Sequence, residues 1–452
     1  MRPSPLDRRR PPGSSAPRPF QFPEFSHQQL ANGLELYVLP TRELPLLHLE
    51  MLLPAGGQYD VPGRPGLASL HSELIDEGSG RRTSLEIAAA IESLGGSLSP
   101  GLGWNMAYVE VGLLSQHLQE GLDLLAEVVR SPSFPEEEIE RRRQQRLAEL
   151  LRRKDLPTSL ADQRFSEVVF GETVYGQPLI GHEESLQQFG RQDLTEFYRQ
   201  HVRPNGARFI AVGDFDPESL VVDLEKTWGD WKEGSSTSPT PIEPRPLPQT
   251  QIHLVDRPGS SQTQLHLGHA SLPRSHPDFH RWILLNTLFG GKFTSRINLN
   301  LRERHGFTYG ANSFVTRRHG PGPWTIRTAV GTEVVGAAVR ELLFEMRRIR
   351  DEPVDEQELM DTQRYLVGVF PYTLQTMGGL LKRLEALAVF GLPDDFYEHY
   401  PSVFLDTTRE ELLETAQRHI QPDHLAIVAV GPAEELRPQL EELGPVTVTT
   451  PQ

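Results

Sequence analysis

The chain has 452 residues, no cysteine and a formal net charge of −16 from 45 basic and 61 acidic side chains. This acidic balance argues against a general nucleic-acid binder, which needs a basic surface. The absence of cysteine excludes disulfides, thiolate nucleophiles and cysteine-ligated metal sites. With 37% hydrophobic residues and no run of about 18 apolar residues, we expect sizeable cores and no membrane-spanning helix.

The first 25 residues are rich in proline, arginine and serine and contain no apolar block. A secretory signal needs ~7–15 apolar residues. We therefore expect a disordered arm at 1–25 and, from this start, a cytoplasmic protein. A Ser/Thr/Pro-rich stretch predicts a linker at 234–249. It separates two domains, 26–233 and 250–445, and leaves a tail at 446–452.

The two halves of the chain resemble each other. ARFIAVG ends at Gly213 and LAIVAVG ends at Gly431, so the offset is 431 − 213 = 218 residues. Each of these glycines follows a histidine, His201 or His419, by twelve residues. Alternating segments that begin at residues 47 and 265 lie at a similar offset. Two matches at nearly the same offset predict a duplicated domain.

Within the first half, strand and helix patterns are mixed. Alternating apolar residues predict strands at 34–39 and 107–114. Helical spacing predicts helices at 116–130 and 136–154, the second starting after Pro135. Short strands before long helices indicate an α+β fold, in which each domain has an antiparallel sheet with helices packed on one face.

A helix predicted at 69–77 is opened by Pro-Gly-Leu-Ala at 65–68 and ends at Gly78. This opening resembles the insulinase/pitrilysin family of zinc peptidases. Further matching stretches are 84–98 (SLEIAAAIESLGGSL), 155–157, 175–181, 204–215 and 284–310. The resemblance covers nearly the whole chain after residue 25, and it implies two similar domains that form half of a clamshell.

The chain departs from this family at the metal site. The family follows Gly-Leu-Ala with the inverted zinc motif His-x-x-Glu-His, and here the three positions hold Ser69, Ser72 and Glu73. The family's third ligand, a glutamate about 76 residues further on, corresponds to Glu149. Without two histidines and the general base, we expect neither a bound metal nor a catalytic residue in this chain. Glu149 is then expected to be solvated or ion-paired.

No replacement site is indicated elsewhere. His71 and Glu73 are two residues apart on a helix, so ~200° of rotation separates them. Ser69 and Glu73 share a helix face, but a neutral hydroxyl is a poor zinc ligand. His276 and His280 lack an accompanying motif glutamate, so we interpret them as structural. The Gly-Gly pairs lack a phosphate-loop context, and no Gly-x-Ser-x-Gly elbow indicates a serine nucleophile.

The second half keeps one functional pattern of the family. Arg302 and Tyr309 are seven residues apart, in a stretch resembling Leu-Arg-x-x-x-Gly-x-x-Tyr. The resemblance implies that this pair faces the zinc site across the cavity and binds the substrate backbone. A guanidinium donates well to carbonyl oxygens, and a tyrosine hydroxyl can donate to an oxyanion. The alternative is that Arg302 is a surface cation and Tyr309 a core aromatic.

A lost zinc motif beside an intact Arg/Tyr pair resembles the non-catalytic subunit of heterodimeric family members. We therefore expect a substrate-binding subunit of a zinc metallopeptidase that acts on peptides. The resemblance implies a homologous partner that carries the intact motif and the zinc, while this chain binds no cofactor itself. Two alternatives stay open. One is a structural subunit, like the similar core subunits of respiratory complexes, and the other is a peptide-binding module without a role in proteolysis.

Overall fold

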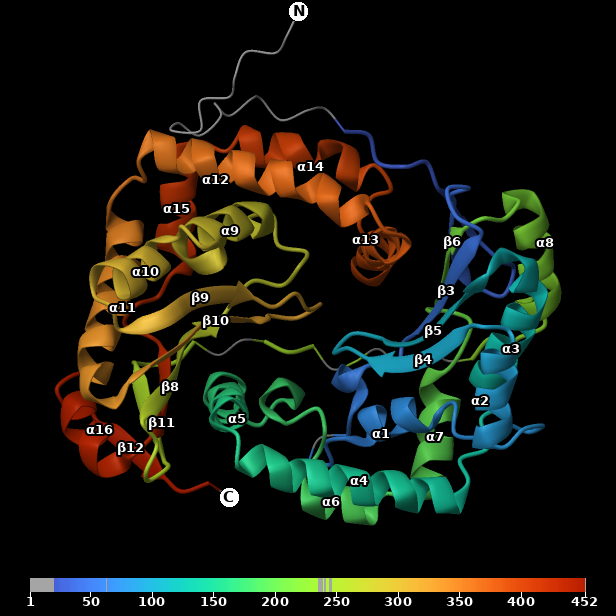
Figure 1. Ribbon diagram of the computed structural model, residues 1–452, viewed down its shortest axis with the longest axis horizontal. Coiled ribbons are helices and arrows are strands. Elements are labelled where there is room, and N and C mark those ends of the chain that lie inside the picture. Colours follow the sequence, from blue (N-terminus) through green and yellow to red (C-terminus); the bar gives the residue numbers. More distant parts are fainter. Residues whose placement is uncertain (1–19, 62, 235–238, 240, 244–245, 452) are drawn as a thin grey trace, which may run out of the picture.

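The computed structural model describes residues 20–61, 63–234, 239, 241–243 and 246–451. Two halves, each built around a six-stranded sheet, lie side by side in Figure 1, the first in blue and green and the second in yellow to red. Residues 1–19 of the predicted arm and much of the predicted linker lie outside the described residues. Among the described helices, none is long and apolar enough to cross a membrane.

The first half contains six strands and eight α-helices within the described residues. The strands are β1 (Ser26–Gln29), β2 (Glu35–Pro40), β3 (Leu46–Leu53), β4 (Ser97–Leu102), β5 (Ala107–Leu114) and β6 (Arg208–Gly213). The helices are α1 (Leu67–Leu74), α2 (Ser84–Ser93), α3 (Leu118–Arg130), α4 (Glu136–Lys154), α5 (Pro157–Phe170), α6 (Glu183–Gln188), α7 (Arg191–His201) and α8 (Pro217–Trp228).

The second half has the same number of each among the residues described. Its strands are β7 (Gln251–Asp256), β8 (Gln262–Ala270), β9 (Thr308–Val315), β10 (Pro323–Gly331), β11 (Ala426–Gly431) and β12 (Val446–Thr449). Its helices are α9 (Phe279–Asn286), α10 (Arg296–Asn298), α11 (Val335–Asp351), α12 (Glu356–Val369), α13 (Met377–Phe390), α14 (Phe396–Leu405), α15 (Arg409–His419) and α16 (Ala433–Glu441). Two π-helical turns, Thr287–Gly291 and Leu299–Arg304, flank α10.

The predicted duplication is confirmed by the order of the strands. The sheets run β1-β2-β6-β3-β5-β4 and β12-β7-β11-β8-β10-β9, so five positions correspond one to one. The prediction of antiparallel sheets needs a correction, because β2 runs parallel to β6 and β7 runs parallel to β11. Glu35 pairs with Arg208, which lies 208 − 35 = 173 residues later. A local sequence pattern does not reveal a pairing at such a separation.

Both ends of the described chain are more ordered than the sequence suggests. Val446–Thr449 forms strand β12 beside β7, so the predicted tail begins after the domain's last strand and not at residue 446. Near the start, Phe20 packs against Phe370 and Phe22 stacks on Tyr397, with ring centres 4.9 and 4.8 Å apart. The described part of the predicted arm is therefore packed against the second half.

Helices cover both faces of each sheet, which corrects the expectation of one covered face. The outer faces pack against helices of their own half and form two large apolar cores. The inner faces pack against a helix from the other half: α13 lies against β3 and β6, and α5 lies against β8 and β11 (Figure 1). This reciprocal packing holds the two halves together. The backbone N–H of His319 also donates to Asn105 Oδ1 at 3.0 Å, which joins the β9–β10 loop to the β4–β5 loop.

Candidate functional site: a refilled metal position and an exposed Arg/Tyr pair

The backbone around the start of α1 explains the Gly-Leu-Ala motif. The N–H groups of Gly66 and Ala68 donate to the carboxylate of Asp60 at 2.8 and 2.7 Å, which caps the helix. Gly66 has a φ of 100°, and a Cβ there would lie 2.7 Å from the Cα of Gly181. The backbone segments at Gly66 and Gly181 therefore pass too close to each other for a side chain at either position. The contact brings the segment at residue 180 to the degenerate zinc motif.

An arginine from α4 fills the position between the two former histidine sites. Arg146 donates from Nη2 to Ser69 Oγ at 2.6 Å and from Nε to Glu73 Oε2 at 2.9 Å. It also donates from Nη1 to the carbonyl oxygen of Ile180 at 2.9 Å, and its side chain is only 3% exposed. The Arg146 guanidinium therefore binds both replacement side chains, the Glu73 carboxylate and the neutral Ser69 hydroxyl. A serine hydroxyl and a carboxylate that already binds a cation do not fit a zinc ion.

Glu149, which corresponds to the family's third zinc ligand, forms ion pairs within its own helix. Glu149 pairs with Arg152 at 2.8 Å and with Arg153 at 3.0 Å on its own helix. The hydrogen bonds and charges of these two arginines lower the pKa of Glu149 to about 2. Glu149 is ion-paired, as the sequence predicts.

His71 and Ser72 do not contribute to a shifted site. His71 is fully buried between Phe134 and Phe197, with ring centres 5.3 and 5.2 Å away. Burial lowers the pKa of His71 to about 3, so its ring is neutral. Glu73 is on the other side of α1, in contact with Arg146, as the helical geometry predicts. The Ser72 hydroxyl donates to the carbonyl of Gly101 at 2.9 Å and holds α1 against β4.

A cavity of about 720 Å³ lies between the halves, and Ser69 and Glu73 are part of its wall. The first half supplies residues of α1, α4 and α5 and the segment 176–184. The second half supplies alternate residues of β10, which point to one side of the strand. The lining residues from this half are Thr316, Arg318, Pro323, Thr325 and Arg327. The former metal position thus opens into a space that both halves enclose.

The structure brings Arg302 and Tyr309 together on the surface of the second half. The guanidinium carbon of Arg302 lies 5.6 Å from the ring centre of Tyr309 and 4.6 Å from that of Phe293. Tyr309 is 94% exposed, so it is not a core aromatic. Arg302 also pairs with Glu303 at 3.3 Å.

A β-bulge causes this exposure. Thr328 pairs with Ala311 and Val330 with Thr308, so Tyr309 and Gly310 together face a single residue of β10. A bulge of this kind re-aims a side chain, and here it turns Tyr309 away from the core. Arg302 lies in the π-helical turn that precedes β9, a conformation found often at functional sites.

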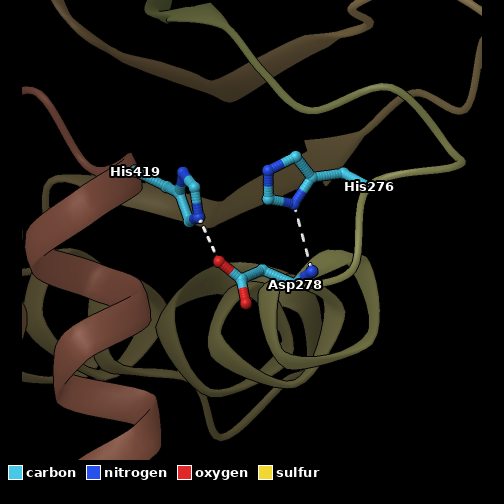
Figure 2. Close-up of side chains that lie close together, drawn as sticks. All are labelled: His276, Asp278 and His419. Carbon is cyan, nitrogen blue, oxygen red and sulfur yellow. Dashed lines mark hydrogen bonds and ion pairs between the residues drawn. The ribbon is translucent and has the colours of Figure 1, made fainter.

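The two histidines at 276 and 280 are separated by the fold. His280 packs against the ring of Phe396, with centres 5.3 Å apart. His276 lies beside Asp278 and His419, and their ligand atoms are within 4.8 Å of one another (Figure 2). However, Asp278 Oδ2 accepts from His419 at 2.8 Å and from Arg418 at 2.9 Å. The cluster therefore joins the start of α9 to the end of α15.

Sequence matches agree with this architecture. Residues 47–183 match the family model for insulinase (peptidase family M16), and residues 188–366 match the model described as the peptidase M16 inactive domain. The chain belongs to the M16 family. It is 24% identical over 334 residues to an uncharacterized zinc protease of Rickettsia bellii, covering 74% of this chain and 80% of the relative. An uncharacterized zinc protease of Mycobacterium bovis is 24% identical over 399 residues, covering 87% and 90%.

Solved structures share the fold of this M16 chain. A crystal structure of a peptidase M16 inactive domain from Pseudomonas fluorescens superposes with a TM-score of 0.85 and 25% identity, over 90% of this chain and 98% of that one. A Helicobacter pylori protease has a TM-score of 0.84 at 17% identity, over 91% and 100%, which shows the fold alone. The two-domain M16 fold is thereby confirmed. Because its zinc motif is lost, the chain is a non-catalytic, peptidase-like member of the family.

Sequence reasoning missed Arg146. It precedes Glu149 by three residues on one helix, and such residues share a helix face. That spacing was a signal that a charged side chain of α4 could reach the altered motif.

Proposed function

We propose that this chain is the substrate-binding, non-catalytic subunit of a heterodimeric zinc peptidase, in which Arg302 and Tyr309 act in trans. The observation that carries the proposal is the exposed Tyr309 with the half-buried Arg302 beside it. Tyr309 is held out of the core by the bulge, and Arg302 is stacked against its ring. Within the described part of the chain, the Tyr309 hydroxyl has no hydrogen-bond partner, so it can donate to a ligand from outside.

The metal then comes from a homologous partner. Arg146 occupies the former metal position in this chain, so peptide hydrolysis needs a second subunit with an intact His-x-x-Glu-His motif. In the complex, Tyr309 donates to the oxyanion that forms on the scissile carbonyl, and Arg302 donates to a neighbouring peptide carbonyl. Zinc, when bound by the partner, polarises the carbonyl and activates water.

The scaffold hypothesis does not explain the position of Arg302 and Tyr309. A scaffolding subunit needs buried contacts with its neighbours, and it does not need an exposed tyrosine held by a bulge. A peptide-binding module needs no zinc-bearing partner at all. Reconstitution with a homologue that carries the intact motif separates the three hypotheses.

The test is steady-state hydrolysis of a quenched peptide by the reconstituted pair. Arg302→Ala and Tyr309→Phe in this chain are expected to lower kcat, by roughly 10²–10³ where the lost donor contacts the oxyanion. Zinc content of the complex should stay unchanged. Arg304→Ala and Tyr372→Phe alter exposed residues of the same types and serve as controls. If both test variants keep kcat/KM within about twofold, the scaffold hypothesis is preferred.

A further inference from the structure

Arg318 is a buried arginine in the loop between β9 and β10. It is 5% exposed. Its guanidinium carbon lies 4.2 Å from the ring centre of Tyr175, 4.5 Å from that of Trp104 and 5.4 Å from that of Phe170. All three rings belong to the first half of the chain, so the cation from one half sits in an aromatic cage supplied by the other.

This cation has no counter-ion of its own. Nε and Nη1 of Arg318 are buried without a hydrogen-bond partner, and among the described residues no carboxylate lies within ion-pair distance. Burial lowers the pKa of Arg318 to about 10, which leaves it charged at neutral pH. A cation–π cage offsets part of the desolvation cost. Buried charged side chains are nevertheless almost always paired with an opposite charge. An anion that binds from outside the chain would supply the missing partner of Arg318.

The side chain of Arg318 forms part of the wall of the 720 Å³ cavity. Two other charged residues on this wall are paired within the protein: Arg327 with Asp162 at 2.6 Å, and Glu73 with Arg146 at 2.9 Å. Arg318 differs from them because it is both buried and unpaired. The ring of Trp104, which also lines the cavity, offers an apolar surface beside the charge.

We propose that Arg318 binds a single carboxylate of a ligand held in this cavity, supplied by the C-terminus or an acidic side chain of a peptide. A guanidinium N–H donates a charge-assisted hydrogen bond to a carboxylate oxygen. The acidic groups of Glu73 and Asp162 on the same wall disfavour a dianion such as phosphate. That the carboxylate belongs to a peptide rests on the proposed function, whereas the anion site itself rests on the cage.

The test is isothermal titration of the full chain, without any partner, with four octapeptides of one neutral sequence. The first has a free C-terminus and the second is its amide. The third and fourth are amides with Glu or Gln at one internal position. A peptide with the recognised carboxylate should bind at least about tenfold more tightly than its uncharged match. The first pair reports on the α-carboxylate and the second pair on the side chain.

Variants then assign the effect to Arg318. Arg318→Met should reduce the preference to within twofold, whereas Arg317→Met, at the exposed neighbouring position, should retain it. Where Arg318→Met does not fold, Arg318→Lys keeps a positive charge but loses the planar guanidinium and its directed N–H donors. It should lower the preference at least threefold. Equal binding of all four peptides, no binding at all, or an undiminished preference in a folded Arg318 variant overturns the proposal.

The outcome is separate from that of the proposed function. Arg302→Ala and Tyr309→Phe are expected to retain the carboxylate preference in this titration, because neither residue lines the cavity. Loss of hydrolysis with intact carboxylate binding therefore concerns the Arg/Tyr pair alone.

Discussion

Arg146 Nε lies 2.9 Å from Glu73 Oε2, so a positive charge from α4 is held against the residue that replaces the family's second zinc-binding histidine. The same guanidinium reaches Ser69, which replaces the first. The guanidinium of Arg146 therefore occupies the former metal position. Two changes oppose zinc binding: the histidine ligands are absent, and a positive charge lies where the metal would bind.

Restoring the motif alone should not restore zinc. In the triple variant Ser69→His, Ser72→Glu and Glu73→His, the guanidinium of Arg146 still occupies the space between the new ligands and repels a dication. We expect well under one zinc per chain by elemental analysis. Adding Arg146→Ala removes the cation and should raise the zinc content clearly above that of the triple variant.

The control for this series is Arg146→Ala by itself, which supplies no histidine and should bind no zinc. Stoichiometric zinc in the triple variant would show that zinc displaces the Arg146 guanidinium. The prediction that Arg146 excludes zinc would then be wrong.

Arg146 should also matter for stability. Arg146→Met removes three hydrogen bonds of a side chain that is 3% exposed, and it leaves the Ile180 carbonyl without that donor. Glu73 is 46% exposed and keeps part of its hydration, so we expect a loss of about 2 kcal/mol in the free energy of unfolding. Arg152→Met, on the exposed side of the same helix, should cost less than about 0.5 kcal/mol. Urea unfolding compares the two, and equal small losses would contradict the prediction.

His71 should make the protein sensitive to acid. Its pKa is about 3 in the folded state because of burial, against 6.5 as the ordinary value. The unfolded chain therefore binds the extra proton first, and the stability that neutral His71 contributes is present above pH 6.5 and lost as the pH falls from there towards 3. Relative to His71→Leu, the wild type should lose at most about 2 kcal/mol between pH 6.5 and 5.

Urea unfolding at several pH values measures this difference. His399→Leu at an exposed position is the matched control and should follow the wild type. Parallel pH profiles for wild type and His71→Leu would mean that the buried ring is protonated in the native state after all.

The sequence predicts those parts of the fold that depend on local pattern and on repetition. The helix at 136–154 has the predicted bounds, because Pro135 precedes it, acidic residues fill its first turn and basic residues its last. The 218-residue repeat identifies β6 and β11 as equivalent strands. The exchange of α5 and α13 between the inner faces of the sheets was not predicted, because an apolar helix face does not specify which sheet will cover it.

At the candidate site, residue spacing predicts the side of a helix on which a side chain lies. It does not predict which residues from other elements contact that side chain. Helical geometry separates His71 from Glu73, and the structure agrees. The exposure of Tyr309 depends on a bulge, which the alternation of β9 does not reveal. Arg318 finds its cage only when the two halves meet, since Trp104 and Tyr175 are far away along the chain. Contacts of this kind arise from tertiary packing, which a single sequence leaves open.

Asp278 provides the last test, because its neighbours resemble a metal site. His276, Asp278 and His419 have ligand atoms within 4.8 Å of one another. The carboxylate already accepts from Arg418 and His419, and a cation beside a ligand oxygen opposes metal binding. We therefore expect that micromolar zinc does not raise the Tm of the wild type. Asp278→Asn should lower the free energy of unfolding by about 1–3 kcal/mol, since it removes the charge that Arg418 contacts.

His276→Ala distinguishes the two roles of this cluster. In the structural role, the carboxylate keeps its bonds to α15, so this variant should lose less stability than Asp278→Asn and should respond to zinc as the wild type does. In a metal-binding role, zinc would raise the wild-type Tm and the increase would disappear in His276→Ala. The second result would overturn the structural interpretation, because zinc could then displace Arg418 from the carboxylate of Asp278.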